Sequence, residues 1–157
     1  MEFDHRQEIR AAQVRLLFEQ LPSGLLATVV NAAILTAILW SNVSQSLLAG
    51  WLLSVLLLAL GREVHRRTYL NRNPAGDESQ RWGRQFLCGV AANGALWGAA
   101  GYLFFTAESY THQVFLAFVL MGMASGGIAT LSALPGAYLL FVIPALTPLW
   151  SAVVEVR

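Results

Sequence analysis

Charge is scarce in this sequence and is absent from long stretches of it. The chain has 157 residues, of which only 12% are charged and 56% are hydrophobic, whereas a soluble domain carries about 25% charged residues. Residues 20–61 contain no charged residue, and residues 85–154 contain only Glu108. The formal net charge of +1 also excludes a basic surface for nucleic acid. We therefore predict an integral membrane protein with no nucleic-acid partner.

Cysteine and catalytic motifs are nearly absent as well. The single cysteine, Cys88, excludes an intramolecular disulfide and a thiolate metal cluster, and its apolar neighbours predict a small buried side chain. His5, His65 and His112 lie on separate segments, so no local pair is spaced to hold a metal or a haem. No HExxH, GxSxG, phosphate-binding loop or CxxC motif occurs. We expect no enzymatic activity in this chain, no metal and no cofactor.

What the sequence does contain is a series of hydrophobic stretches. A bilayer core of about 30 Å needs about 20 mostly apolar residues per helix. Five stretches qualify, at approximately 22–40, 44–61, 85–105, 111–134 and 136–154. Most of the links between them are short, so the neighbouring spans form antiparallel helical hairpins. The predicted fold is all-α, a polytopic transmembrane bundle of five spans.

All ten basic residues are arginines, and their distribution predicts the orientation. Nine of them lie before the first span or in the long link 62–84, whereas the links 41–43 and 106–110 contain none. The positive-inside rule therefore places the N-terminus and the long link in the cytoplasm. Five spans would then leave the C-terminus outside, without a partner helix. We expect a chain truncated from six spans; the alternative is a chain that ends there.

The residues ahead of the first span predict a helix of their own. Good helix formers dominate residues 4–21, and no glycine or proline precedes Pro22. Its apolar face comprises Val14, Leu17, Phe18 and Leu21. We divide the chain into a cytoplasmic, interfacial amphipathic helix, residues 1–21, and a transmembrane domain, residues 22–157, joined by a turn at Pro22-Ser23-Gly24. The alternative is a plain helical extension of the first span.

The predicted membrane interior is small and neutral rather than charged. Asn31 and Asn93 are amides at membrane depth that need partners, and Pro144 should kink the last span. We expect a pocket for a small or lipophilic ligand, with five candidate residues: Asn31, Asn93, Trp97, Ser125 and Pro144. The alternative is that these residues only hold the helices together.

Two further features are candidates for contacts or sensing. The GxxxG pairs Gly94–Gly98 and Gly122–Gly126 predict close approach of helices, within the bundle or between two copies of the chain. Near the expected outer end of the fourth span, Glu108 and His112 are one turn apart and form a candidate pH- or ligand-sensitive pair. A solvated histidine is the alternative.

Several segments resemble a known family. They are residues 13–22 (QVRLLFEQLP), 81–86 (RWGRQF), 115–127 (FLAFVLMGMASGG) and 143–148 (IPALTP). These resemble the N-terminal membrane-associated sensor (MASE-type) domains of bacterial diguanylate cyclases, cyclic-di-GMP phosphodiesterases and some histidine kinases.

The resemblance implies a sensory input module in the bacterial inner membrane. Such modules act as homodimers and pass a ligand or membrane signal to a cytoplasmic output domain, and they usually have an even number of spans. This chain departs from that pattern in its five spans and in lacking an output domain, and truncation would explain both. The alternative is a small-molecule transporter or half-transporter of the drug/metabolite type, although a charge-free interior argues against ion-coupled transport.

Overall fold

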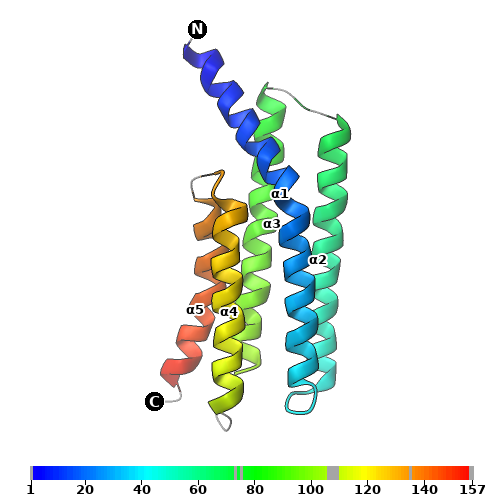
Figure 1. Ribbon diagram of the computed structural model, residues 1–157, viewed down its shortest axis with the longest axis vertical. Helices are drawn as coiled ribbons and strands as arrows, with labels where there is room; N and C mark the ends of the chain where they lie inside the picture. Colours follow the sequence, from blue (N-terminus) through cyan, green and yellow to red (C-terminus); the bar gives the residue numbers. More distant parts are fainter. Residues whose placement is uncertain (1, 73, 75, 106–109, 135, 156–157) are drawn as a thin grey trace.

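Five helices account for the secondary structure of the described chain. The computed structural model describes residues 2–155 except 73, 75, 106–109 and 135. The helices are α1 (Glu2–Leu39), α2 (Gln45–Arg72), α3 (Gly76–Leu103), α4 (Tyr110–Leu131) and α5 (Ala137–Glu155). Successive helices run in opposite directions (Figure 1). The all-α prediction is confirmed for this part of the chain.

The turns between helices follow from local backbone chemistry. After α1, the backbone N–H groups of Asn42 and Val43 both donate to the carbonyl of Leu39, at 3.0 and 3.1 Å. Before α5, Gly136 adopts a φ of 89°, a left-handed conformation that glycine reaches without a steric penalty. The long link predicted at 62–84 is mostly helical, because α2 continues to Arg72.

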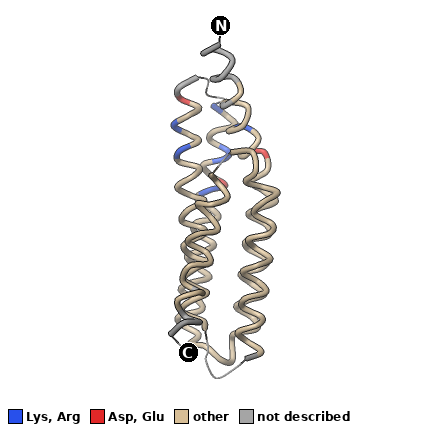
Figure 2. Tube along the Cα trace, turned by 90° about the vertical axis from the view of Figure 1, so that its left-hand side faces the viewer, with Lys and Arg blue, Asp and Glu red and all other residues tan. Residues whose placement is uncertain are grey.

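Apart from Glu155, the last residue of α5, the charged residues coloured in Figure 2 gather at one end of the bundle. This end carries the start of α1 together with the α2–α3 and α4–α5 links, while the α1–α2 and α3–α4 links lie at the opposite end (Figure 1). The grouping of the N-terminus with the α2–α3 link matches the predicted topology. The rest of the bundle is an apolar body.

Four of the helices are long and apolar enough to cross a membrane. Their qualifying segments are Ala11–Leu39, Gln45–Arg72, Glu78–Leu103 and Thr111–Leu131, whereas the corresponding part of α5, Ala137–Pro148, is shorter. Four of the five predicted spans therefore have the required length in the described residues.

The outer surface of the bundle is apolar. Phe118 on α4 is 75% exposed and Trp150 on α5 is 73% exposed, as expected for side chains that face lipid rather than water. Cys88 on α3 lies on this exposed surface, so the prediction of a buried cysteine is wrong. Its small apolar surroundings in the sequence belong to the outer face of a helix instead of the core.

Helix α1 is continuous through Pro22, so the predicted turn at Pro22-Ser23-Gly24 does not form. Instead the helix changes direction part-way along (Figure 1), as expected where a proline removes a backbone donor. The apolar face ahead of the proline is covered by protein, since Phe18 is fully buried and stacks on Tyr69 of α2 with ring centroids 4.0 Å apart. An interfacial position for residues 1–21 stays a prediction.

The closest helix packing in the bundle joins α3 and α5. A Cβ built on Gly94 would overlap the carbonyl oxygen of Phe141, and one built on Gly98 would overlap that of Pro144. The absence of a side chain at both glycines therefore allows the two backbones to touch. On the other side of α3, Trp51 of α2 donates from Nε1 to the Leu96 carbonyl at 2.8 Å, so it is a core residue.

Candidate functional site

A cavity of about 370 Å³ lies between α1, α3 and α4 in the half of the bundle near the charged end. It opens laterally between α1 and α4, where Ala27, Gly122 and Gly126 are exposed. Its wall is mostly apolar, with contributions from Leu17, Leu21, Val90, Met123, Leu131 and Phe141. The helices thus enclose a space of the size used by small-molecule sites, which are roughly 300–1,000 Å³.

Both predicted interior amides, Asn31 and Asn93, line this cavity. The Asn31 Nδ2 group donates to the carbonyl of Ala27 in its own helix at 2.8 Å. Asn93 is only 7% exposed and makes no hydrogen bond with a described residue. A buried amide without a partner is costly unless something else satisfies it, so Asn93 supplies hydrogen-bonding capacity to an occupant of the cavity.

Arg62 is the charged side chain in the cavity wall. It also lines a neighbouring cavity of about 360 Å³ between α1, α2 and α3. Its guanidinium carbon lies 5.4 Å above the ring centroid of Phe86 on α3, a cation–π arrangement. Its side chain runs past Gly89, where a built Cβ would lie 3.2 Å from Nε. Arg62 makes no ion pair or hydrogen bond with any described residue.

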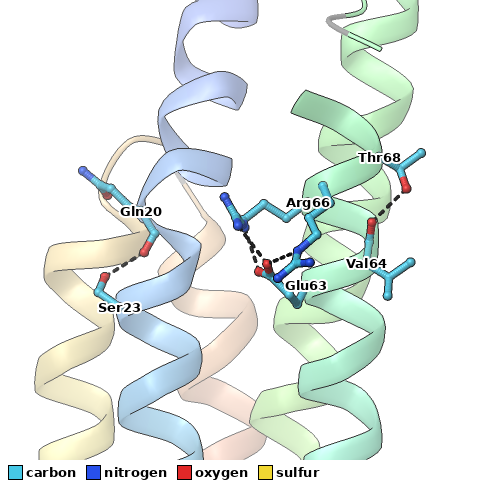
Figure 3. Close-up of polar contacts among 7 residues, drawn as sticks. Gln20, Ser23, Glu63, Val64, Arg66 and Thr68 are labelled. Carbon is cyan, nitrogen blue, oxygen red and sulfur yellow. Dashed lines mark hydrogen bonds and ion pairs between the residues drawn. The ribbon is translucent and has the colours of Figure 1, made fainter. Parts of the chain in front are cut away.

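Glu63, the acid next to Arg62 in the sequence, forms ion pairs with two other arginines, Arg66 and Arg67. Glu63 accepts hydrogen bonds from Arg66 Nε at 2.7 Å and from Arg66 Nη2 at 2.8 Å, and a third from Arg67 Nε at 2.7 Å. The Glu63–Arg66 pair lies along α2, away from Gln20 and Ser23 of α1 (Figure 3). Because adjacent helix residues point in different directions, Glu63 does not neutralise Arg62.

Aromatic rings form a packed cluster above the cavities, at the charged end. Phe18 of α1 meets Phe86 of α3 edge-on, with centroids 5.1 Å apart. His65 of α2 stacks on Trp82 of α3 at 4.6 Å, and Tyr69 completes the cluster against Phe18 and Trp82. His65 Nε2 is buried without a hydrogen-bond partner in the described chain, and its side chain lines the same neighbouring cavity as Arg62.

The remaining pocket candidates lie elsewhere. Trp97 is fully buried and meets Trp51 edge-on with centroids 5.4 Å apart, so it is part of the α2–α3 contact. Ser125 is exposed on α4 and does not line the cavity. Pro144 packs against α3 beside Gly94. The structure therefore brings Asn31 and Asn93 together and separates the other three from them.

The two GxxxG pairs have different surroundings. Gly94 and Gly98 face the backbone of α5, whereas a Cβ built on Gly122 or Gly126 would have no atom within 4 Å. The pair on α4 is therefore not packed within the described bundle, because it lines the lateral opening of the cavity. A role for Gly122 and Gly126 in contact with a second copy stays a prediction.

The candidate pair at the other end is only partly described. Glu108 lies outside the described residues, so its pairing with His112 stays a prediction. His112 instead has a described partner on the α1–α2 link, since Asn42 Nδ2 lies 2.9 Å from His112 Nε2. This hydrogen bond ties the start of α4 to the first hairpin.

The spacing of residues along α2 predicts which helix face carries Arg62. Its charge instead groups Arg62 with the other arginines of the link 62–84. Leu48, Val55 and Tyr69 are buried residues of α2, and Arg62 continues their seven-residue spacing. Positions seven apart lie on nearly the same helix face. Arg62 therefore lies on the same face of α2 as these core residues and is half-buried there. Extending the predicted helix beyond Gly61 would have predicted this position.

No protein-family model, curated protein or solved structure matches this chain. The function must therefore be argued from the cavity and its polar groups.

Proposed function

We propose that this chain is a membrane-embedded sensory module that binds a small or lipophilic ligand in the cavity between α1 and α4. The observation that carries the proposal is the cavity itself, which has a volume of about 370 Å³ and opens at the seam between two helices. Its wall offers the otherwise unbonded Asn93 amide. An occupant contacts both sides of the seam at once.

The packing supports a movement at this seam. The backbones of α3 and α5 touch at Gly94 and Gly98, so these helices move as one unit. The α1–α2 hairpin lies across the cavity from α4. A ligand shifts the packing of α1 against α4 when its affinity for two arrangements differs. Helix α1 then carries the change to the charged end, where Phe18 packs on α2 and α3.

The resemblance to membrane-associated sensor domains extends this proposal. The apolar outer surface fits a bilayer, and the arginine-rich end fits the cytoplasmic side of the bacterial inner membrane. In this proposal the module works as a homodimer and drives a cytoplasmic output domain.

A distance measurement tests the movement without knowledge of the ligand. Spin labels at Leu26→Cys on α1 and Ile128→Cys on α4, both exposed sites, in a Cys88→Ser background report the width of the seam. Gly126→Leu inserts a side chain into the cavity and should shift the distance distribution, as an occupant would. Gly50→Leu, at a glycine with equally open surroundings on α2, is the matched control. Identical distributions in all three proteins would overturn the proposal.

A further inference from the structure

A half-buried cation, Arg62, lies in the wall of a mostly apolar cavity. Arg62 lines both cavities, and its guanidinium group has five N–H donors, none of which bonds to a described residue. Its cation–π contact with Phe86 replaces only a small part of the lost hydration. An ionisable residue inside a membrane bundle ordinarily marks a site that binds or moves an ion or ligand.

The surrounding charges leave Arg62 available to an anion. The nearest acid in sequence, Glu63, already accepts from Arg66 and Arg67. The described walls of both cavities contain no Asp or Glu. A planar guanidinium binds a carboxylate or phosphate with two parallel hydrogen bonds, so an anion is the group that Arg62 is equipped to hold.

The rest of the cavity favours binding of an apolar part of the ligand. Apart from Arg62, the wall consists mainly of apolar side chains such as Leu21, Val90 and Met123. Along α1 the lining extends from Ser23 to Asn31, which is about 12 Å at 1.5 Å per residue. We propose that the ligand is an amphiphile with one anionic headgroup, held by Arg62, and an apolar chain lying in the α1–α4 cavity.

Two further observations agree with this assignment. The buried His65 Nε2 has no described partner and shares the second cavity with Arg62, so it offers a second polar contact to the headgroup. The lateral opening lies between α1 and α4, where Ala27 and Gly126 leave the cavity exposed. An amphiphile dissolved in a bilayer reaches the cavity through that opening. The inference rests on the proposed function and names the ligand class for the same site.

Native mass spectrometry of the full chain, reconstituted in nanodiscs of zwitterionic lipid, tests whether the cavity binds an anionic amphiphile. The probes are decanoate, decanol, which has the same chain without the charge, and inorganic phosphate, which has charge without a chain. A separate arm uses nanodiscs that contain phosphatidylglycerol. Decanoate binding indicates a free carboxylate as the source, and retained phosphatidylglycerol indicates a lipid headgroup; both are anionic amphiphiles.

We expect saturable binding of decanoate or phosphatidylglycerol to the wild type, weaker by about tenfold or more in Arg62→Gln and intermediate in Arg62→Lys, which keeps the charge but cannot form the two parallel hydrogen bonds. Arg67→Gln removes the same charge from the exposed side of α2 and should bind like the wild type. Thermal unfolding of each variant checks that it is folded.

Other outcomes separate this inference from the proposed function. Equal binding of decanol and decanoate, both reduced by Gly126→Leu, would overturn the anionic headgroup while leaving the cavity as a ligand site. Equal binding of the anionic probes to wild type and Arg62→Gln would overturn the role of Arg62. No cavity-dependent binding of any probe would overturn both proposals.

Discussion

A single arginine gives the cavity its chemical character. Arg62 follows a run of 42 uncharged residues, 20–61, and sits at a position of α2 where the same face otherwise buries Leu48 and Val55. Arg62 is half-buried, and a partly desolvated cation without a described counter-ion lowers the stability of the folded chain. Binding of an anionic ligand would offset this loss of stability. We therefore expect substitutions of Arg62 that stabilise the fold to weaken ligand binding.

Replacing Arg62 by leucine should therefore stabilise the protein. The substitution removes the desolvation penalty and extends the apolar face of α2, which we expect to raise the free energy of unfolding by about 1–2 kcal/mol. Thermal unfolding in zwitterionic nanodiscs measures the effect. Arg67→Leu, at a side chain that is 72% exposed, is the control and should not be stabilised. A less stable Arg62→Leu protein would show that the arginine is satisfied within the fold.

Residue-level reasoning from the sequence succeeded where one helix decides the outcome. The spacing of Val14, Leu17 and Phe18 predicted a single apolar helix face, and the structure buries all three side chains against other helices. The sequence placed Asn93 and Trp97 in the same predicted pocket. It could not show that they face different helices, because the neighbour of each face of α3 depends on the packing of the bundle. Asn93 faces α1 and α4 across the cavity, whereas Trp97 faces Trp51 of α2.

The helices divide into a rigid unit and a looser seam. The α3–α5 contact depends on two glycines that leave no room for a Cβ, while the glycines of α4 border the cavity. Hydropathy predicted the apolar part of each helix but not how far α2 and α3 extend beyond it, to Arg72 and from Gly76. In α2, the i, i+3 and i, i+4 pairs of Glu63 with Arg66 and Arg67 favour the extension. The sequence motif GxxxG did not distinguish a packed pair from an open one.

A methyl group at Gly98 should disrupt the rigid unit. Gly98→Ala places a Cβ against the Pro144 carbonyl of α5, and separating the two backbones should cost about 1–3 kcal/mol of unfolding free energy. Thermal unfolding of the reconstituted protein is the measurement. Gly50→Ala, where a Cβ meets nothing within 4 Å, should be neutral or slightly stabilising. Equal stability of the two variants would contradict the proposed α3–α5 contact.

The segment of α1 ahead of Pro22 should depend on its aromatic anchor. Phe18→Ala removes a ring that contacts Tyr69 and Phe86, and we expect a loss of about 3–5 kcal/mol. Hydrogen–deuterium exchange should become faster in residues 11–21 than in the rest of α1. Leu16→Ala, at an exposed position of the same segment, should leave exchange unchanged. Faster exchange in neither variant would mean that the segment is held by other contacts.

The molecule as a whole is polarised along its long axis. The charged residues coloured in Figure 2 lie at the end that holds the start of α1 and the α2–α3 link, and the apolar body extends from there to the α1–α2 turn. The distribution of arginine in the sequence was sufficient to predict this polarity. The cavity could not be predicted from the sequence, because it depends on how α1, α3 and α4 pack together.

Thiol labelling in intact cells tests the proposed orientation. With Cys88 changed to serine, a cysteine at Asn71 should react only with membrane-permeant reagents, since the arginine-rich end is predicted to be cytoplasmic. A cysteine at Ser41, in the turn at the opposite end, should react with impermeant reagents as well. Both positions are exposed. The reverse pattern would place the arginine-rich end outside.

The central claim is that an occupant of the α1–α4 cavity changes helix packing. The most direct measurement is the distance between spin labels at Leu26→Cys on α1 and Ile128→Cys on α4, with and without saturating decanoate, in the Cys88→Ser background. Decanoate should shift the distribution in this protein and leave it unchanged when Gly126→Leu fills the cavity. An unchanged distribution in the presence of bound decanoate would contradict the account.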